Sequence, residues 1–169
     1  MRVLTCTLAL LLLPALPVVA QDTTRLIPNG FALGATVDRL TIGDSDGPLV
    51  STTLHISSLR RRRLTPEFAV AVFPRYLAEG AAVLIPDVGA AYNLSLPGAT
   101  VLLRAGASGV FVFGDGFGGA LPGVHYGASL LVPLLRGFGL RVDAVGRTFA
   151  LYESTRGMSL GIGITSLPR

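Results

Sequence analysis

The chain has no lysine, no tryptophan and a single cysteine, Cys6. One cysteine excludes an intrachain disulfide and a cysteine-based metal site. The sequence also shows no spacing of histidines with carboxylates that is typical of a metal site, so we expect no metal and no cofactor. Charge is scarce as well, because only 14% of the 169 residues are charged, against about 25% in an ordinary soluble domain. This composition disfavours a typical soluble enzyme.

The one long apolar stretch lies at the beginning of the chain. Residues 1–20 begin with the basic Arg2, continue with a leucine-rich run and end in small residues before Gln21. This layout is typical of a secretory signal peptide. We therefore divide the chain into a signal peptide (residues 1–20), a short polar lead-in (21–29) and one β-barrel domain (30–169).

After the signal peptide, the sequence contains no apolar run of about 20 residues, which a transmembrane helix requires. Apolar residues are instead distributed over eight short segments bounded by Gly, Pro, Asp or Ser. Such segments are typical of β-strands separated by turns. The expected strands cover residues 30–42, 48–58, 65–75, 81–94, 100–113, 123–134, 138–150 and 158–166.

Alternation of apolar and polar residues supports the strands, because successive side chains of a strand point to opposite faces. In the seventh segment, for example, Val142 falls on the apolar face and its neighbours Arg141 and Asp143 fall on the other. Seven segments alternate in this way. The first is less regular, because Arg39 shares the face of the apolar Val37.

The polar face is rich in Gly, Ala and Ser and has few long charged side chains. Small residues suit the interior of an eight-stranded barrel, which has just enough room for side chains. We therefore predict an all-β fold: an eight-stranded antiparallel up-and-down transmembrane β-barrel, with its apolar face toward lipid. The alternative is a soluble, lipocalin-like barrel that turns the apolar face inward and carries an apolar ligand.

Several charged residues fall on the predicted lumen face. Buried charges are costly unless they are paired, so we expect these residues to pair across the lumen and to fix the strand register. The other interpretation of the same residues is a gated or ion-selective pore. The network comprises Asp38, Glu67, Asp87, Arg104, Arg141, Asp143 and Arg147.

Two further groups of residues suggest chemistry. The basic run Arg60, Arg61, Arg62 and Arg63 is suited to contact with phosphate or lipid headgroups, because guanidinium groups bind phosphate in a forked geometry; the alternative is a solvated hairpin turn with a basic flank. His55 and Ser57 share one strand face and could form a base and a nucleophile of a lipid-modifying hydrolase, although a structural interior histidine is the simpler interpretation. We expect no nucleic-acid binding, despite a net charge of +4, because an exported protein seldom meets nucleic acid.

The C-terminal half, HYGASLLVPLLRGFGLRVDAVGRTF followed by MSLGIGIT, resembles the small outer-membrane β-barrel superfamily. The shared pattern is a strand with small interior residues, a tight turn, a strand with a charged interior face and a final strand that alternates with glycine. The resemblance implies an eight-stranded barrel in the bacterial outer membrane with no defined reaction. It also implies the outer-membrane lipids and the outer-membrane assembly machinery as partners, and we expect a monomer.

Overall fold

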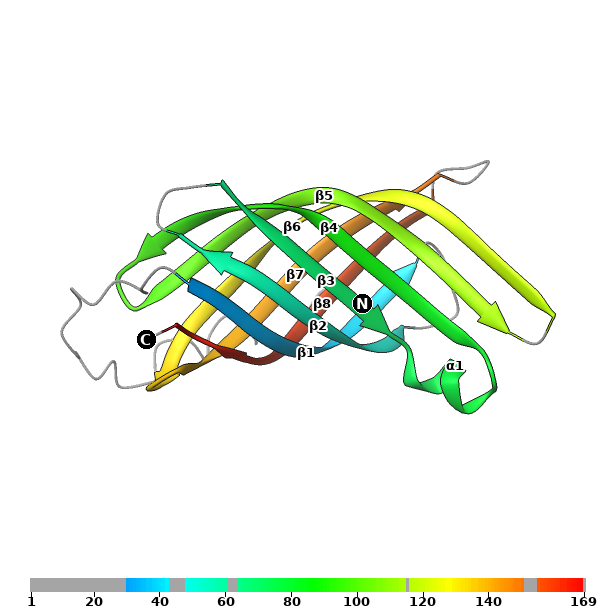
Figure 1. Ribbon diagram of the computed structural model, residues 1–169, viewed down its shortest axis with the longest axis horizontal. Helices are drawn as coiled ribbons and strands as arrows, with labels where there is room; N and C mark the ends of the chain where they lie inside the picture. The colour runs from blue at the N-terminus through cyan, green and yellow to red at the C-terminus, as the bar shows by residue number, and fades with distance from the viewer. Residues whose placement is uncertain (1–29, 43–47, 61–63, 115, 151–154, 169) are drawn as a thin grey trace, which may run out of the picture.

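The computed structural model describes residues 30–42, 48–60, 64–114, 116–150 and 155–168. The expected signal peptide and lead-in lie outside the described residues. The described strands form one closed barrel in the order β1 to β8 (Figure 1). Their bounds are β1 Gly30–Ile42, β2 Leu49–Leu59, β3 Leu64–Val72, β4 Ala82–Leu96, β5 Ala99–Gly114, β6 Phe117–Leu135, β7 Phe138–Phe149 and β8 Thr155–Ser166.

Each strand pairs antiparallel with the next one along the chain, and β1 pairs antiparallel with β8 to close the barrel. In the closing seam, Val37 lies opposite Ile162. The prediction of an eight-stranded antiparallel up-and-down barrel is therefore confirmed.

The turns after β4 and β6 are very short, because only two residues separate each of these strands from the next. Both turns contain a glycine with positive φ: 76° at Gly98 and 82° at Gly137. Glycine adopts this conformation without steric cost, so it is the expected residue there. These two turns lie at the end of the barrel where β1 begins and β8 ends, which we call the terminal end; the opposite end we call the far end.

The expected third strand, residues 65–75, is wrong at its end. β3 stops at Val72, and a short helix, α1, covers Pro74–Ala78. Proline has no amide to donate to a strand ladder, but it is favourable in the first turn of a helix. The sequence pattern was too short to indicate this helix. No helix in the described part of the chain is long and apolar enough to cross a membrane.

The expected sixth strand, residues 123–134, begins too late. β6 starts at Phe117 and pairs with β5 from Gly114↔Phe117 onward, whereas its pairing with β7 begins only at Gly123. The glycine-rich stretch that was expected to connect the fifth and sixth strands is therefore largely an extension of the β5–β6 hairpin. Pro122 fits there because β6 has no described partner strand on its other side at this residue.

The barrel is apolar outside and polar inside. Leu33, Val50 and Ile162 are each 59% exposed on the outer wall, whereas Arg141 and Asp143 are almost completely buried in the interior. This orientation is the reverse of what a soluble carrier of an apolar ligand requires. An outer wall of exposed aliphatic side chains is instead suited to lipid.

Candidate functional site

The middle of the lumen is built around Arg141, whose exposed fraction is 0%. Its Nη2 lies 2.8 Å from Oε1 of Glu67 on β3, and its Nε lies 2.9 Å from Oδ2 of Asp143 on β7. Its Nη1 and Nη2 also donate hydrogen bonds of 3.1 Å to the hydroxyls of Ser57 and Ser129. One guanidinium therefore joins strands β2, β3, β6 and β7.

A second arginine completes this central cluster from β5. Arg104 Nη1 lies 3.2 Å from Glu67 Oε1, and Arg104 Nη2 lies 3.5 Å from Asp143 Oδ1. Two buried arginines thus share two buried carboxylates. Equal numbers of opposite charges with additional hydrogen bonds are the arrangement in which buried ions are tolerated.

A separate ion pair lies nearer the far end. Arg147 Nη2 on β7 is 2.6 Å from Asp87 Oδ2 on β4, and Asp87 Oδ1 also accepts a hydrogen bond of 2.6 Å from Ser108. Arg147 Nη1 donates to Ser159 at 2.8 Å, while His125 Nδ1 lies 3.8 Å from Asp87 Oδ1. This group joins β4, β5, β6, β7 and β8.

Asp38 differs from the other six residues of the expected network. Among the described residues, its carboxylate lies within salt-bridge distance of no arginine and accepts hydrogen bonds from Thr36, at 3.1 Å, and from Thr53. The expectation that Asp38 pairs with an opposite charge is therefore wrong. Hydroxyl donors from β1 and β2 satisfy it instead.

The structure does not join His55 to Ser57 as a base and a nucleophile. The Ser57 hydroxyl donates to Glu67 Oε1 at 3.1 Å and accepts from Arg141. His55 Nε2 lies 3.0 Å from the Thr36 hydroxyl and 3.5 Å from an Asp143 oxygen. Both side chains are structural parts of the polar interior.

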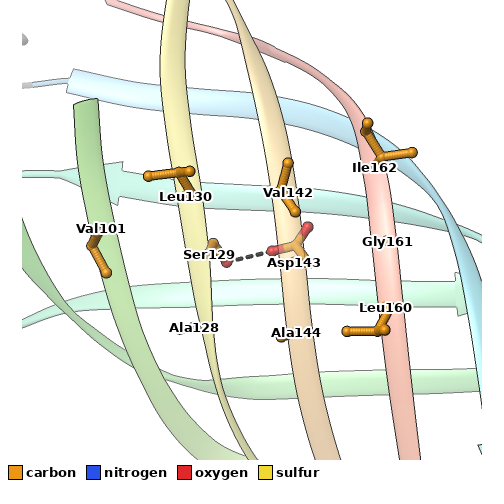
Figure 2. Close-up of a pocket in the computed structure, with 10 residues that line it drawn as sticks. All are labelled: Val101, Ala128, Ser129, Leu130, Val142, Asp143, Ala144, Leu160, Gly161 and Ile162. Atoms are coloured by element: carbon orange, nitrogen blue, oxygen red, sulfur yellow. Dashed lines mark hydrogen bonds between the residues drawn. The ribbon is translucent and has the colours of Figure 1, made fainter. Parts of the chain in front are cut away.

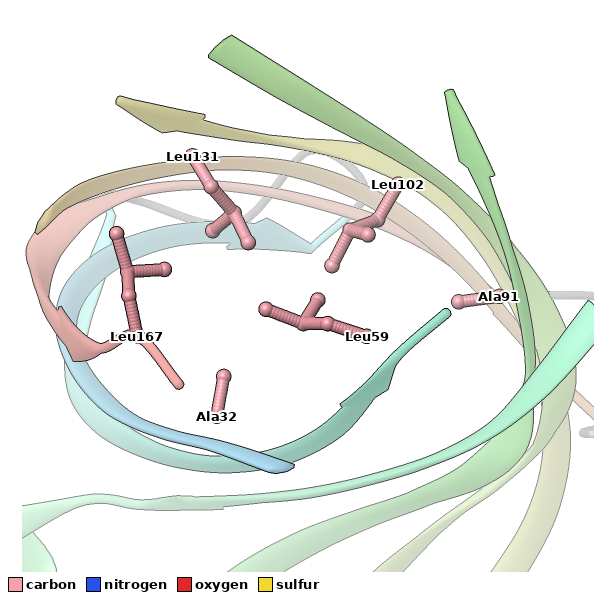
Figure 3. Packing of buried hydrophobic residues seen from close by; sticks show 6 residues of the cluster. All are labelled: Ala32, Leu59, Ala91, Leu102, Leu131 and Leu167. Atoms are coloured by element: carbon pink, nitrogen blue, oxygen red, sulfur yellow. The ribbon is translucent and has the colours of Figure 1, made fainter. Parts of the chain in front are cut away.

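The charged interior lies between two apolar clusters, one at each end of the barrel. At the terminal end, six side chains come together inside the ring of strands (Figure 3): Ala32, Leu59, Ala91, Leu102, Leu131 and Leu167. At the far end the buried cluster is Leu40, Ala71, Phe73, Ile85 and Phe149, with Tyr76 of α1 packed against it. We call these the terminal plug and the far plug.

The plugs are features that the sequence pattern did not reveal, because the inward face was expected to be polar throughout. Leu102 and Leu131 fall on the same strand faces as Arg104 and Ser129, so parity alone assigns them to the lumen. A search for large apolar residues of inward parity near strand ends would have found them.

The expected phosphate-binding run is only partly described. Arg60 is exposed, and its backbone carbonyl accepts a hydrogen bond of 2.8 Å from Asn93 Nδ2. Arg61, Arg62 and Arg63 lie outside the described residues. The inward-facing Asn93 therefore fixes the first residue of the β2–β3 connection at the terminal end.

The charged side chains of the described interior bind mainly one another and nearby hydroxyls. In the ranges that the structure describes, no group of three or more His, Cys, Asp or Glu side chains is placed to hold a metal ion. The buried arginines and carboxylates bind one another, and their hydroxyl partners come from neighbouring strands. Such an arrangement links strands that are not neighbours in the sheet, as expected if the network fixes the strand register.

Comparisons with known proteins agree with this architecture. No family model matches the sequence, and no curated protein matches it. Among solved structures, Neisserial surface protein A (NspA) is 14% identical, with a TM-score of 0.57 over 82% of this chain and 98% of that chain. The N-terminal β-barrel domain of Pseudomonas aeruginosa OprF is 12% identical, with a TM-score of 0.55 over 82% and 99%. A major outer membrane protein from Thermus thermophilus is 11% identical, with a TM-score of 0.58 over 82% and 98%. The chain therefore has the fold of the small eight-stranded outer-membrane β-barrels, which confirms the resemblance drawn from the sequence.

Proposed function

We propose that this chain is a non-enzymatic protein of the bacterial outer membrane, exported by its signal peptide, which acts as a monomeric and non-conducting barrel. Its role is structural or is exerted through its short surface connections. The observation that carries the proposal is a lumen filled by paired charges between two apolar plugs. The apolar outer wall and the fold support the membrane location.

Two features of the interior support a non-conducting lumen. Ions must pass the terminal plug, where Leu59, Leu102 and Leu131 are at most 3% exposed. They must then pass the central cluster, where Arg141 bridges strands on different sides of the barrel. An eight-stranded barrel is in general just wide enough for side chains to fill it.

Two measurements test the proposal. The membrane-extracted protein, run in SDS with and without boiling, is expected to migrate differently, because a closed barrel resists the detergent until heat unfolds it. Reconstitution into planar bilayers is then expected to give no single-channel steps. Reproducible steps would favour the gated pore, whereas a protein found in the soluble fraction would contradict the membrane location itself.

The basic run Arg60–Arg63 supports a second element of the proposal, a contact with the phosphates of lipid headgroups at the terminal end. Guanidinium groups near a membrane surface each contribute about 1 kcal/mol of attraction to anionic lipid. A variant with all four arginines replaced by glutamine is expected to insert more slowly into phosphatidylglycerol vesicles and at an unchanged rate into phosphatidylcholine vesicles. Equal slowing in both lipids would contradict a contact that depends on the net negative charge of the lipid.

The proposal also includes the outer-membrane assembly machinery as the partner that inserts the barrel. Depletion of that machinery in cells is expected to lower the amount of the heat-modifiable protein in the membrane fraction. The alternative of a hydrolase has weaker support, because His55 and Ser57 have different hydrogen-bond partners. If the natural chain hydrolyses lipid and both His55→Ala and Ser57→Ala abolish this activity, the hydrolase alternative gains support.

A further inference from the structure

The outer wall of the barrel is not uniform, because Ala144 and Gly146 of β7 are small whereas the residues of β8 opposite them, Leu160 and Met158, are large. The outward residues of β7 are Val142, Ala144, Gly146 and Thr148. On one side they lie opposite Leu130, Ala128, Tyr126 and Val124 of β6, and on the other opposite Ile162, Leu160, Met158 and Arg156 of β8. The result is a furrow along β7 with β6 and β8 as its walls, which we call the β7 furrow.

Two adjoining grooves occupy this furrow. The first has a volume of about 450 Å³ and is lined by Ala128, Leu130, Val142 and Leu160 among others. The second has a volume of about 530 Å³ and is lined by Tyr126, Gly146, Met158 and Arg156 among others. Ala144 lines both grooves, so they adjoin at this residue.

Figure 2 shows the first groove, with β6, β7 and β8 side by side. Ala128 and Ala144 are short between the longer side chains of Leu130 and Leu160. Ser129 and Asp143 contribute to its base and are hydrogen-bonded to each other. In the second groove the ring of Tyr126 leans over Gly146, where an added Cβ would lie 2.8 Å from Tyr126 Cζ. The furrow thus has an aromatic wall near the far end.

The dimensions of the β7 furrow match one leaflet of a bilayer. From Val142 to Thr148 a strand extends about 20 Å, and a tilt of about 35–45° reduces this to about 15 Å along the membrane normal. That length is half of a hydrocarbon core of about 30 Å. The length of the furrow along the membrane normal therefore corresponds to about one leaflet.

A positive charge lies at the end of the furrow that is nearer the far end of the barrel. Arg156 is exposed, follows the outward parity of Met158 and lines the second groove. In the described strands all four carboxylates face inward, those of Asp38, Glu67, Asp87 and Asp143. No acidic side chain of the described strands therefore faces outward beside Arg156.

From this geometry we infer that the β7 furrow binds one anionic phospholipid, with an acyl chain over Ala144 and beside the ring of Tyr126, and with the phosphate on Arg156. A guanidinium binds phosphate with two parallel hydrogen bonds, which fixes the position of the headgroup. The inference rests on the membrane location proposed above. It adds a defined lipid site to a wall that otherwise contacts lipid without preference.

Lipid retention by the purified barrel tests the inference. The detergent-extracted protein is mixed with phosphatidylglycerol or phosphatidylcholine, and the retained lipid is counted by native mass spectrometry. We expect a preference of about fivefold for phosphatidylglycerol, the amount that one arginine near a lipid phosphate provides. Arg156→Gln is expected to remove the preference, and Ala144→Phe is expected to lower retention of both lipids by filling the furrow.

Matched controls separate the site from general effects. Ala90→Phe places the same side chain on the outer wall of β4, away from both grooves, and Arg75→Gln removes an exposed arginine of α1 at the far end. Both controls are expected to retain lipid as the natural chain does. Unchanged retention in Ala144→Phe, or an equal loss in Ala90→Phe, overturns the inference. A dimer that Ala144→Phe dissociates also overturns it, since a second copy would then occupy the furrow.

The heat-dependent gel shift of each variant shows whether it has folded. If Ala144→Phe fails to fold, Ala144→Leu fills the same place with a smaller side chain and is judged by the same criterion. If the natural chain itself does not insert, the proposed function fails. If the natural chain inserts and retains neither lipid, only the lipid site fails.

Discussion

Arg147 on β7 and Asp87 on β4 meet across the interior of the barrel, with 2.6 Å between Nη2 and Oδ2. Both side chains are at most 5% exposed. The two strands are not neighbours in the sheet, so this contact joins opposite parts of the wall directly. The ion pair therefore holds together two parts of the wall that strand pairing does not connect.

The first prediction concerns this pair. Asp87→Asn leaves Arg147 without a counter-ion in a buried position, so the free energy of unfolding should fall by about 3–5 kcal/mol. Urea titration of the barrel in phospholipid vesicles measures the change. The double variant Asp87→Asn with Arg147→Gln is expected to lose less free energy of unfolding than Asp87→Asn alone. If the two variants lose the same amount, the unpaired arginine is not the cause of the loss.

The second prediction concerns the terminal plug. Leu102 is 0% exposed inside the barrel, whereas the adjacent Leu103 is 47% exposed on the outer wall. Leu102→Ala should create a cavity and lower the free energy of unfolding by about 2–5 kcal/mol. Leu103→Ala should have a much smaller effect, because lipid fills the space. The same titration compares them, and equal losses would contradict the inward assignment of Leu102.

The third prediction concerns a close approach of two strands. Gly106 on β5 lies opposite Gly89 on β4, and a Cβ added at Gly106 would collide with the backbone of Val88 and Gly89. Gly106→Ala is therefore expected to lower the free energy of unfolding by about 1–3 kcal/mol. Gly119→Ala is the control, because a Cβ there meets nothing within 4 Å. A neutral Gly106→Ala would show that the strands can separate at no cost.

The fourth prediction tests the facing of β7. Val142 lies on the outer wall between Leu130 and Ile162, and an arginine there would cost about 2–4 kcal/mol near the middle of the bilayer. Val142→Arg should lower the fraction of protein that inserts into vesicles. Arg141→Ala should still insert, because Glu67 and Asp143 keep Arg104 as a partner. Equal insertion of both variants would contradict the assigned faces.

Strand number, topology and facing could be predicted because each depends on local alternation. The side-chain period of two assigns Arg141 inward and Val142 outward without any knowledge of the partners. Arg39 was the apparent exception, and it does lie on the outer wall with Val37. The alternation was therefore correct even where the residue type was unexpected.

Partners across the lumen could not be predicted, because they depend on the stagger of strands around the closed barrel. Sequence alone identified Asp38 as a lumen charge but could not show that Thr36 and Thr53 bind it. The same limit applies to the β7 furrow, which exists because Ala144 and Gly146 of β7 fall in register with the large Leu160 and Met158 of β8. The helix α1 was missed because five residues are too few to show a helical period.

The bond from Arg141 to Glu67 connects residues that are 74 positions apart in the chain. Neither charge can be neutralised by the other until β3 and β7 belong to the same closed ring. Loop closure over such a distance is slow, because the chain loses conformational entropy before the contact forms. Contacts of this kind therefore stabilise the protein only after the strands have come together. The ion pairs of the central cluster are therefore expected to form late in folding. Once the last strand has docked, they should stabilise the closed barrel against reopening of the β1–β8 seam.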